Sequence, residues 1–235
     1  MKERLQKIIS GYGIASRRQA EKLLLEGRVT INGIVASVGD TADAEVDQIA
    51  VGGHILSSRP AHVYLMLNKP RGYVTTLHDE RGRKNVTELV KDCGTRVYPV
   101  GRLDQYSEGL LVLTNDGELT NKLTHPKGNI EKKYHVWVNS YDKQQAGKLE
   151  SSIEIDGRPS IPAKVRVISL KDQSAMLEFT LYEGRNRQIR RLCEHAGMQV
   201  TRLKRIQEGH LRLGDLPVGK WRMLSAEEVM LLQKE

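Results

Sequence analysis

Cysteine is scarce in this chain. Only Cys93 and Cys193 occur among 235 residues, far apart and in no C-x-x-C arrangement. This argues against a disulfide framework and against a zinc site. Long apolar runs are also missing, since nothing near the start resembles a signal peptide and no run approaches membrane-spanning length. We therefore expect a soluble protein of a reducing compartment, the cytoplasm, with no membrane partner.

Motifs that bind cofactors are absent as well. The sequence has no Walker loop, no G-x-G-x-x-G fingerprint and no group of His and Cys at metal-ligand spacing. It has no internal repeat and no low-complexity stretch. We therefore expect no cofactor and no metal, in a chain long enough to bury a real core.

Positive charge is in excess. Lysine and arginine number 37 against 29 aspartates and glutamates, which gives a net charge of +8 and a pI near 9.4. A basic balance favours a polyanionic partner, but it does not indicate a fold.

A polar junction at Ser57–Pro60 predicts a linker between two domains, 1–60 and 61–235. In the first domain, the apolar spacing from Leu5 to Tyr12 predicts a helix. A capping-box pattern, with Ser16 three residues before Gln19, opens a second helix. Asn32-Gly33 then predicts a hairpin with a type I′ turn.

The charges on the second helix are unusual. Arg17 and Arg18 occupy its first turn, where the helix dipole disfavours cations. Arg18 and Lys22 also repeat like charge at i,i+4. Either these side chains face phosphates, or they form an ordinary solvated face.

Strands outnumber helices after residue 61, and hairpin turns such as 171–174 recur. Strands are predicted at 63–67, 97–100, 110–114, 134–138, 163–170, 175–182, 200–206 and 211–213. Helices are predicted after Asp116, after Asp142 with Gln145, after Ser225 with Glu228, and over 187–196 with Gly197 at its end. This pattern favours an α+β fold with a mixed, mostly antiparallel sheet flanked by helices.

The stretch Gly101–Gly117, GRLDQYSEGLLVLTNDG, places Asp104 in a short loop between two β-forming runs. An acid at the rim of a sheet, flanked by glycines, is a typical place for a nucleophile or base. The alternative is that Asp104 closes a turn or pairs with Arg102. Asp116, by contrast, is interpreted as a helix cap and not as a catalytic group.

This stretch resembles the catalytic signature of RsuA/RluB-type pseudouridine synthases. NKPRGYVTT (68–76), KKYHVWV (132–138) and EGRNRQIRRL (183–192) agree with the same family, in the same order along the chain. The N-terminal RLQKIISGYGIASRRQAEKLLLEGRVTINGIV resembles an S-four-like RNA-binding domain. The resemblance implies an rRNA-modifying isomerase that needs no cofactor, and its motifs are more similar to the 23S than to the 16S branch.

The resemblance assigns Asp104 as the catalytic acid, either nucleophile at C1′ or base at C2′, and Arg190 as the cation paired with it. From the residues alone, Arg190 flanks the apolar face of its helix closely enough to reach inward. The alternative is that the arginines of this helix form a solvated basic face.

Tyr134 is a core aromatic by its strand periodicity, whereas the family implies a ring stacked on the target uracil; both can hold. Arg102 is implied to fill the space of the extruded nucleotide, although a salt bridge to Asp104 or Glu108 is an alternative.

RNA contacts are implied or expected for a set of basic residues: Arg17, Arg18, Lys22, Arg28, Arg102, Arg187 and Arg191. Lys69 and Arg71 are candidates for RNA backbone contacts, although the rigid turn at Pro70 and Gly72 explains this segment equally well. The run Arg202, Lys204 and Arg205 is expected to extend the phosphate-binding surface.

We therefore expect a monomeric rRNA pseudouridine synthase, 23S-directed rather than 16S-directed. Two rivals remain, a non-catalytic RNA-binding assembly factor with the same fold and a structural ribosomal protein. All of them predict RNA binding, and only the enzyme needs Asp104.

Overall fold

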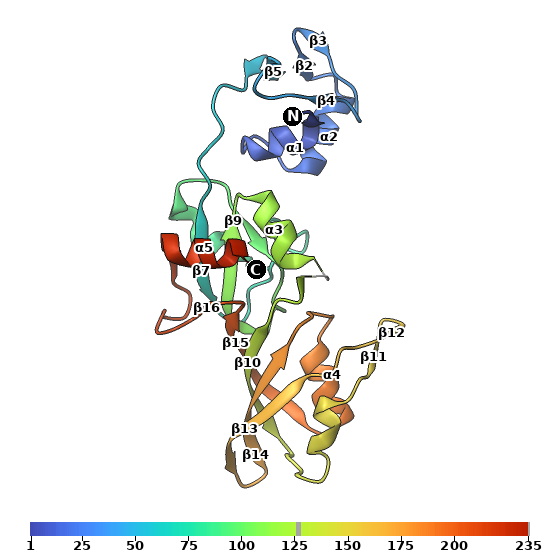
Figure 1. The fold of residues 1–235 in the computed structure, drawn as a ribbon, viewed down its shortest axis with the longest axis vertical. Coiled ribbons are helices and arrows are strands. Elements are labelled where there is room, and N and C mark those ends of the chain that lie inside the picture. The colour runs from blue at the N-terminus through green and yellow to red at the C-terminus, as the bar shows by residue number, and fades with distance from the viewer. Residues whose placement is uncertain (126–127, 235) are drawn as a thin grey trace. The chain divides into compact units, whose positions relative to one another are not determined.

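The computed structural model describes residues 1–125 and 128–234 (Figure 1). Contacts divide the chain into two compact units. Unit 1 is Met1–Val63 with Cys93–Arg96 and Asn115–Gly117, and unit 2 is Tyr64–Asp92, Val97–Thr114 and Glu118–Glu235. Each unit has its own hydrophobic core. Among the described residues, no helix combines the length and the apolar character needed to cross a membrane.

Unit 1 is a helix-helix-sheet module. Its elements are β1 (Glu3–Arg4), α1 (Leu5–Gly11), α2 (Arg17–Leu25), β2 (Val29–Ile31), β3 (Ile34–Val35), β4 (Thr41–Ala42), β5 (Ile49–Val51) and β6 (His54–Ile55). The capping box is present, since the Gln19 backbone N–H donates to Ser16 Oγ and the Ser16 backbone N–H donates to Gln19 Oε1. Asn32 and Gly33 have φ of 51° and 82°, as the predicted type I′ turn requires.

The strands of unit 2 form one mixed sheet. Its described strands are β7 (Tyr64–Lys69), β8 (Tyr98–Val100), β9 (Glu108–Thr114), β10 (Lys132–Asn139), β13 (Lys164–Lys171), β14 (Ser174–Leu181), β15 (Gln199–Glu208), β16 (Leu211–Arg212) and β17 (Trp221–Met223). The order is β13-β14-β10-β15-β9-β7-β17, with β8 beside β9 and β16 beside β15. Only the β9–β15 pair is parallel among these described pairs. The predicted α+β class is confirmed.

Gly109 makes the parallel pair possible. It has φ of +104° and lies opposite Arg205 in the β9–β15 register. A Cβ atom at this position would lie 2.7 Å from the Arg205 backbone nitrogen and closer still to its carbonyl oxygen. Only glycine allows the two backbones to approach in this way.

Helices and short connections flank the sheet. They are η1 (Val86–Cys93), α3 (Gly117–Thr124), η3 (Ala146–Glu150), β11 (Glu154–Ile155), β12 (Arg158–Pro159), α4 (Gln188–His195) and α5 (Ala226–Lys234), where η denotes a 3₁₀ helix. The helix predicted after Asp142 is only the short η3. Asp142 Oδ1 accepts the Gln144 backbone N–H at 2.8 Å, so Asp142 forms a local turn instead of capping a helix.

Candidate active site

Three residues predicted from separate motifs line one cavity. Asp104 lies in the loop between β8 and β9, Tyr134 on β10 and Arg190 on α4. The cavity measures about 80 Å³, and Leu181 and Leu203 form apolar parts of its wall. The fold therefore brings an acid, a tyrosine and an arginine together from widely separated parts of the sequence.

Lys69 holds the loop that carries Asp104. Its side chain is fully buried, and Nζ donates to the carbonyl oxygens of Ser107 at 2.8 Å, Asp104 at 3.1 Å and Gln105 at 3.5 Å. A further bond reaches Pro70 O at 3.1 Å. Burial lowers the pKa of Lys69 to about 8. The expectation that Lys69 touches RNA is wrong, because no part of the side chain reaches the surface.

Arg190 faces the same loop from α4. Its Nη2 donates to Tyr106 O at 3.3 Å, and Nη1 donates to Val200 O at 3.4 Å. Nε is buried without a hydrogen-bond partner. Within the described residues, no ion pair of 4 Å or less joins Arg190 to Asp104. Burial lowers the pKa of Arg190, followed by the charge of Arg187, and the Asp104 carboxylate acts in the opposite direction.

Tyr134 is almost entirely buried, yet it borders the cavity. Its exposed fraction is 7%, and Val136 and Val138 share its face of β10, as the two-residue period predicts. Burial raises the pKa of Tyr134 most, and the Arg205 guanidinium lowers it. The ring thus packs in the core and also forms part of the cavity wall.

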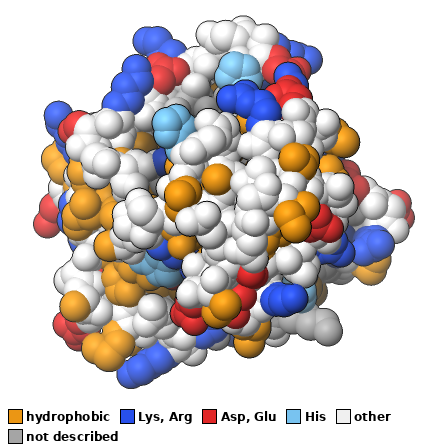
Figure 2. Space-filling model, turned by 90° about the horizontal axis from the view of Figure 1, so that it is seen from above, with side chains coloured by type: hydrophobic (Ala, Val, Ile, Leu, Met, Phe, Trp, Pro, Cys, Tyr) orange, Lys and Arg blue, Asp and Glu red, His pale blue; other side chains and the backbone are white. Residues whose placement is uncertain are grey.

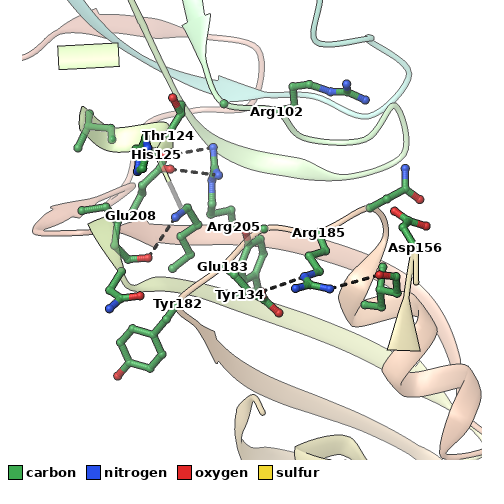
Figure 3. A pocket seen from close by; sticks show the side chains of 18 of the residues that line it. Arg102, Thr124, His125, Tyr134, Asp156, Tyr182, Glu183, Arg185, Arg205 and Glu208 are labelled. Carbon is green, nitrogen blue, oxygen red and sulfur yellow. Dashed lines mark hydrogen bonds and ion pairs between the residues drawn. The ribbon is translucent and has the colours of Figure 1, made fainter. Parts of the chain in front are cut away.

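A second, larger cavity adjoins the first. It measures about 590 Å³ and shares Arg102, Tyr134 and Arg185 with the smaller one. Figure 3 shows Arg205 and Glu208 toward one end of it and Arg185 and Asp156 toward the other. The two cavities together form a cleft large enough for more than one nucleotide unit.

The loop before α4 is fixed by a polar network. Arg185 donates to Glu183 Oε2 at 3.0 Å and to Arg158 O at 2.9 Å. Gln188 donates to Glu183 Oε1 at 2.8 Å. These bonds hold the wall shared by both cavities, and no pattern in the sequence predicted them beyond the resemblance of this segment.

The predicted RNA-contacting arginines of unit 2 differ in their surroundings. Arg102 and Arg187 are exposed at the cavity rim, and neither has an ion pair within 4 Å in the described part of the chain. Arg102 therefore does not pair with Asp104 or Glu108. Arg191 is half-buried and pairs with Asp156 at 3.3 Å.

The prediction that Arg202, Lys204 and Arg205 form a phosphate-binding surface is wrong for Arg205. Its exposed fraction is only 2%, because it shares the inward face of β15 with Leu203. Arg202 pairs with Glu108 at 2.6 Å and covers the ring of Trp137.

In unit 1, the candidate RNA-contacting residues are all exposed: Arg17, Arg18, Lys22 and Arg28. Lys22 and Arg28 both lie 3.8 Å from Glu26, so their charge is partly balanced. Figure 2 shows Lys and Arg in separate groups, several beside Asp or Glu, around uncharged and apolar surface. The excess positive charge forms no single continuous patch on that face.

The fold and the site define a class of protein before any comparison is made. An α+β unit holds a cleft with an acid, a tyrosine and an arginine, and a separate module presents exposed cations. This combination is typical of an enzyme that acts on a polyanion such as RNA.

Comparisons with known proteins identify the family. The family model described as RNA pseudouridylate synthase matches residues 63–195, and that of the S4 domain matches residues 3–55. The chain belongs to the RNA pseudouridine synthase family, whose members are isomerases, and it carries an N-terminal S4 domain.

Individual relatives match over nearly the whole chain. Ribosomal large subunit pseudouridine synthase B of Bacillus subtilis (strain 168) is 44% identical over 234 residues, covering 98% of this chain and 96% of that protein. Dual-specificity RNA pseudouridine synthase RluF of Escherichia coli (strain K12) is 37% identical, covering 98% and 78%. A crystal structure of a pseudouridylate synthase has a TM-score of 0.68 at 29% identity, covering 97% of this chain and 99% of that one.

Proposed function

We propose that this chain isomerises one specific uridine of 23S rRNA to pseudouridine, with Asp104 as the essential catalytic residue. The observation that carries the proposal is the meeting of Asp104, Tyr134 and Arg190 around one cavity. The similarity to an enzyme named for the large ribosomal subunit supports 23S rRNA as the substrate. Such a substrate is found where ribosomes are made, which supports a cytoplasmic location.

The reaction needs few parts. The N1–C1′ bond of uridine breaks, the uracil turns, C5 bonds to C1′, and the proton of C5 leaves as N1 gains one. Asp104 acts on the sugar, either as nucleophile at C1′ or as base at C2′. Lys69 fixes the loop from behind, so the carboxylate is presented to the cavity in one position.

The other side chains position the nucleotide. Tyr134 supplies an aromatic wall for the detached uracil, and Arg190 supplies positive charge beside the loop of Asp104. A uridine must leave its stack to reach this depth, which costs a few kcal/mol. Arg102, exposed at the rim, fills the vacated space and offsets part of that cost.

The remaining basic residues bind RNA backbone. Residues 1–60 form the anchoring domain, with contacts from Arg17, Arg18, Lys22 and Arg28, and residues 61–235 form the catalytic domain. Arg187 and Arg191 add phosphate contacts beside the cavity. The enzyme acts as a monomer, because one chain supplies the acid, the tyrosine and the arginine.

Pseudouridine mapping tests the proposal. Ribosomal RNA from cells lacking the gene is compared with RNA from cells complemented by the unchanged chain or by Asp104→Asn. We expect one 23S position to lose its pseudouridine and to regain it only with the unchanged chain. A lost position in 16S rRNA would correct the substrate. Full restoration by Asp104→Asn would favour a non-catalytic assembly factor.

A further inference from the structure

Arg205 is a buried charge that the proposed reaction has not yet used. It is 2% exposed, and it ranks among the largest fully buried side chains of the described protein. A buried ion pair is often no more stable than apolar residues of the same size. Arg205 therefore invites an explanation beyond stability.

The guanidinium is held in one place by its own strand and by β9. Nε donates to Leu110 O at 2.7 Å. Nη1 donates to Glu208 Oε1 at 3.4 Å, and Nη2 lies 3.2 Å from Glu208 Oε2. Glu208 is itself 2% exposed. The pair is therefore rigid, with two of its atoms, Arg205 Nη2 and Glu208 Oε2, lacking a well-directed hydrogen bond.

Tyr134 is the direct neighbour of Arg205 across the sheet. The two residues are register partners between β10 and β15, at the point where the register shifts between Lys133 and Tyr134. The Arg205 guanidinium hydrogen-bonds to the Tyr134 side chain. Both residues line the larger cavity, as Figure 3 shows, and Tyr134 also lines the smaller one with Asp104.

This hydrogen bond fixes the direction of the tyrosine proton. A guanidinium has only donors, so the Tyr134 oxygen accepts from Arg205 and its own hydrogen must point elsewhere. With the Arg205 side occupied, that hydrogen is free to point into the cleft. A positive charge at the oxygen also favours the ionised phenol.

We propose that Arg205, held by Glu208, is a positioning residue for Tyr134, orienting its hydroxyl toward the bound nucleotide and setting how readily it exchanges a proton. This rests on the proposed function, because it assumes that Tyr134 faces the reacting uridine. It gives the Arg205–Glu208 pair a role distinct from phosphate binding.

The charges around Tyr134 make opposite predictions for two variants. The Arg205 charge lowers the pKa of Tyr134, whereas the Glu208 and Asp104 charges raise it. Arg190 and Arg187 of α4 and Arg102 and Arg185 of the neighbouring loops complete the charged groups around the cavities. Arg205→Gln should therefore raise the pKa of Tyr134, and Glu208→Gln should lower it.

The test places difluorotyrosine at position 134 of the full chain. The fluorine atoms bring ionisation of the phenol into a range where the protein stays folded, and ¹⁹F NMR follows that single ring with pH. We expect a higher ring pKa in Arg205→Gln and a lower one in Glu208→Gln. Arg202→Gln is the control, since it removes the same charge from the outward face of β15 and should leave the ring unchanged.

Kinetics on chains with natural tyrosine complete the test. Arg205→Gln should reduce kcat roughly 10²-fold with an unchanged KM for rRNA, and Arg205→Lys should recover part of the loss. If Arg205→Gln does not fold, Glu208→Gln and Arg205→Lys give the same comparison. A ring pKa that does not respond to Glu208 and Arg205, or responds equally to Arg202→Gln, overturns the proposal. Activity retained by Asp104→Asn would instead refute the proposed function and leave the measured Arg205–Tyr134 coupling intact.

Discussion

Lys69 shows how a single side chain positions the candidate catalytic loop. Replacing it with methionine leaves the carbonyl oxygens of Asp104, Gln105 and Ser107 without their shared donor. Unsatisfied buried acceptors of this kind cost about 1–3 kcal/mol. We expect Lys69→Met to lower the free energy of unfolding by that amount in urea titrations and to reduce turnover. An unfolding midpoint equal to that of the unchanged chain would contradict this role.

The depressed pKa of Lys69 also sets a pH dependence. The folded protein holds the lysine near 8, below its ordinary value of 10.5, so folding releases a proton between these values. Stability therefore gains a contribution as pH rises from about 8 toward 10.5, because the unfolded chain binds the extra proton. Lys69→Met lacks this gain. Urea unfolding of both chains from pH 7 to 10 checks the difference, and parallel curves would show that Lys69 does not titrate as expected.

Tyr134 separates packing from chemistry. Tyr134→Phe keeps the buried ring and removes only the hydroxyl, so the variant should fold and bind RNA with near-normal affinity. We expect most of its turnover to be lost, by roughly 10²-fold, if the hydroxyl exchanges a proton during the reaction. Single-turnover assays with saturating enzyme measure this. Unchanged rates would reduce Tyr134 to a core residue.

Among the elements, the parallel β9–β15 pair depends most on one residue. Gly109→Ala would place a Cβ against the Arg205 backbone, which cannot move aside as a flexible side chain could. We expect a loss of roughly 3 kcal/mol or more in stability. Gly147→Ala is a matched control, because nothing lies within 4 Å of its added Cβ and it has no positive φ. Equal thermal stability of the two variants would contradict the close approach.

The elements also show what sequence patterns convey. The capping box at Ser16, the turn at Asn32-Gly33 and the strand periodicity of Tyr134 were predictable because each depends on neighbouring residues. The burial of Lys69 and Arg205 was missed, although each follows a leucine two residues earlier and so shares its inward face. Charge was taken as evidence of exposure, and partners distant in the chain supplied the bonds that make burial possible. The parallel pairing had no local signal beyond Gly109.

For the whole molecule, unit 1 is expected to supply affinity and unit 2 chemistry. Arg17→Gln with Arg18→Gln removes two exposed cations. We expect weaker rRNA binding and a shallower dependence of affinity on salt, by about one slope unit for each phosphate that these arginines neutralise. Single-turnover rates at saturating enzyme should not change.

The control removes the same charge elsewhere. Lys143→Gln with Lys171→Gln neutralises two exposed lysines outside the candidate RNA-binding set. Binding isotherms at several salt concentrations compare the two double variants. An equal loss of affinity in both would mean that unit 1 contributes only net charge.

The catalytic carboxylate can be tested on purified protein. The measurement is tritium release from rRNA labelled at uracil C5, under single-turnover conditions, for the unchanged chain and for Asp104→Asn with matched circular dichroism spectra. We predict stoichiometric release by the unchanged chain and none above background by Asp104→Asn. Release at the same rate by the folded Asp104→Asn protein would contradict the assignment.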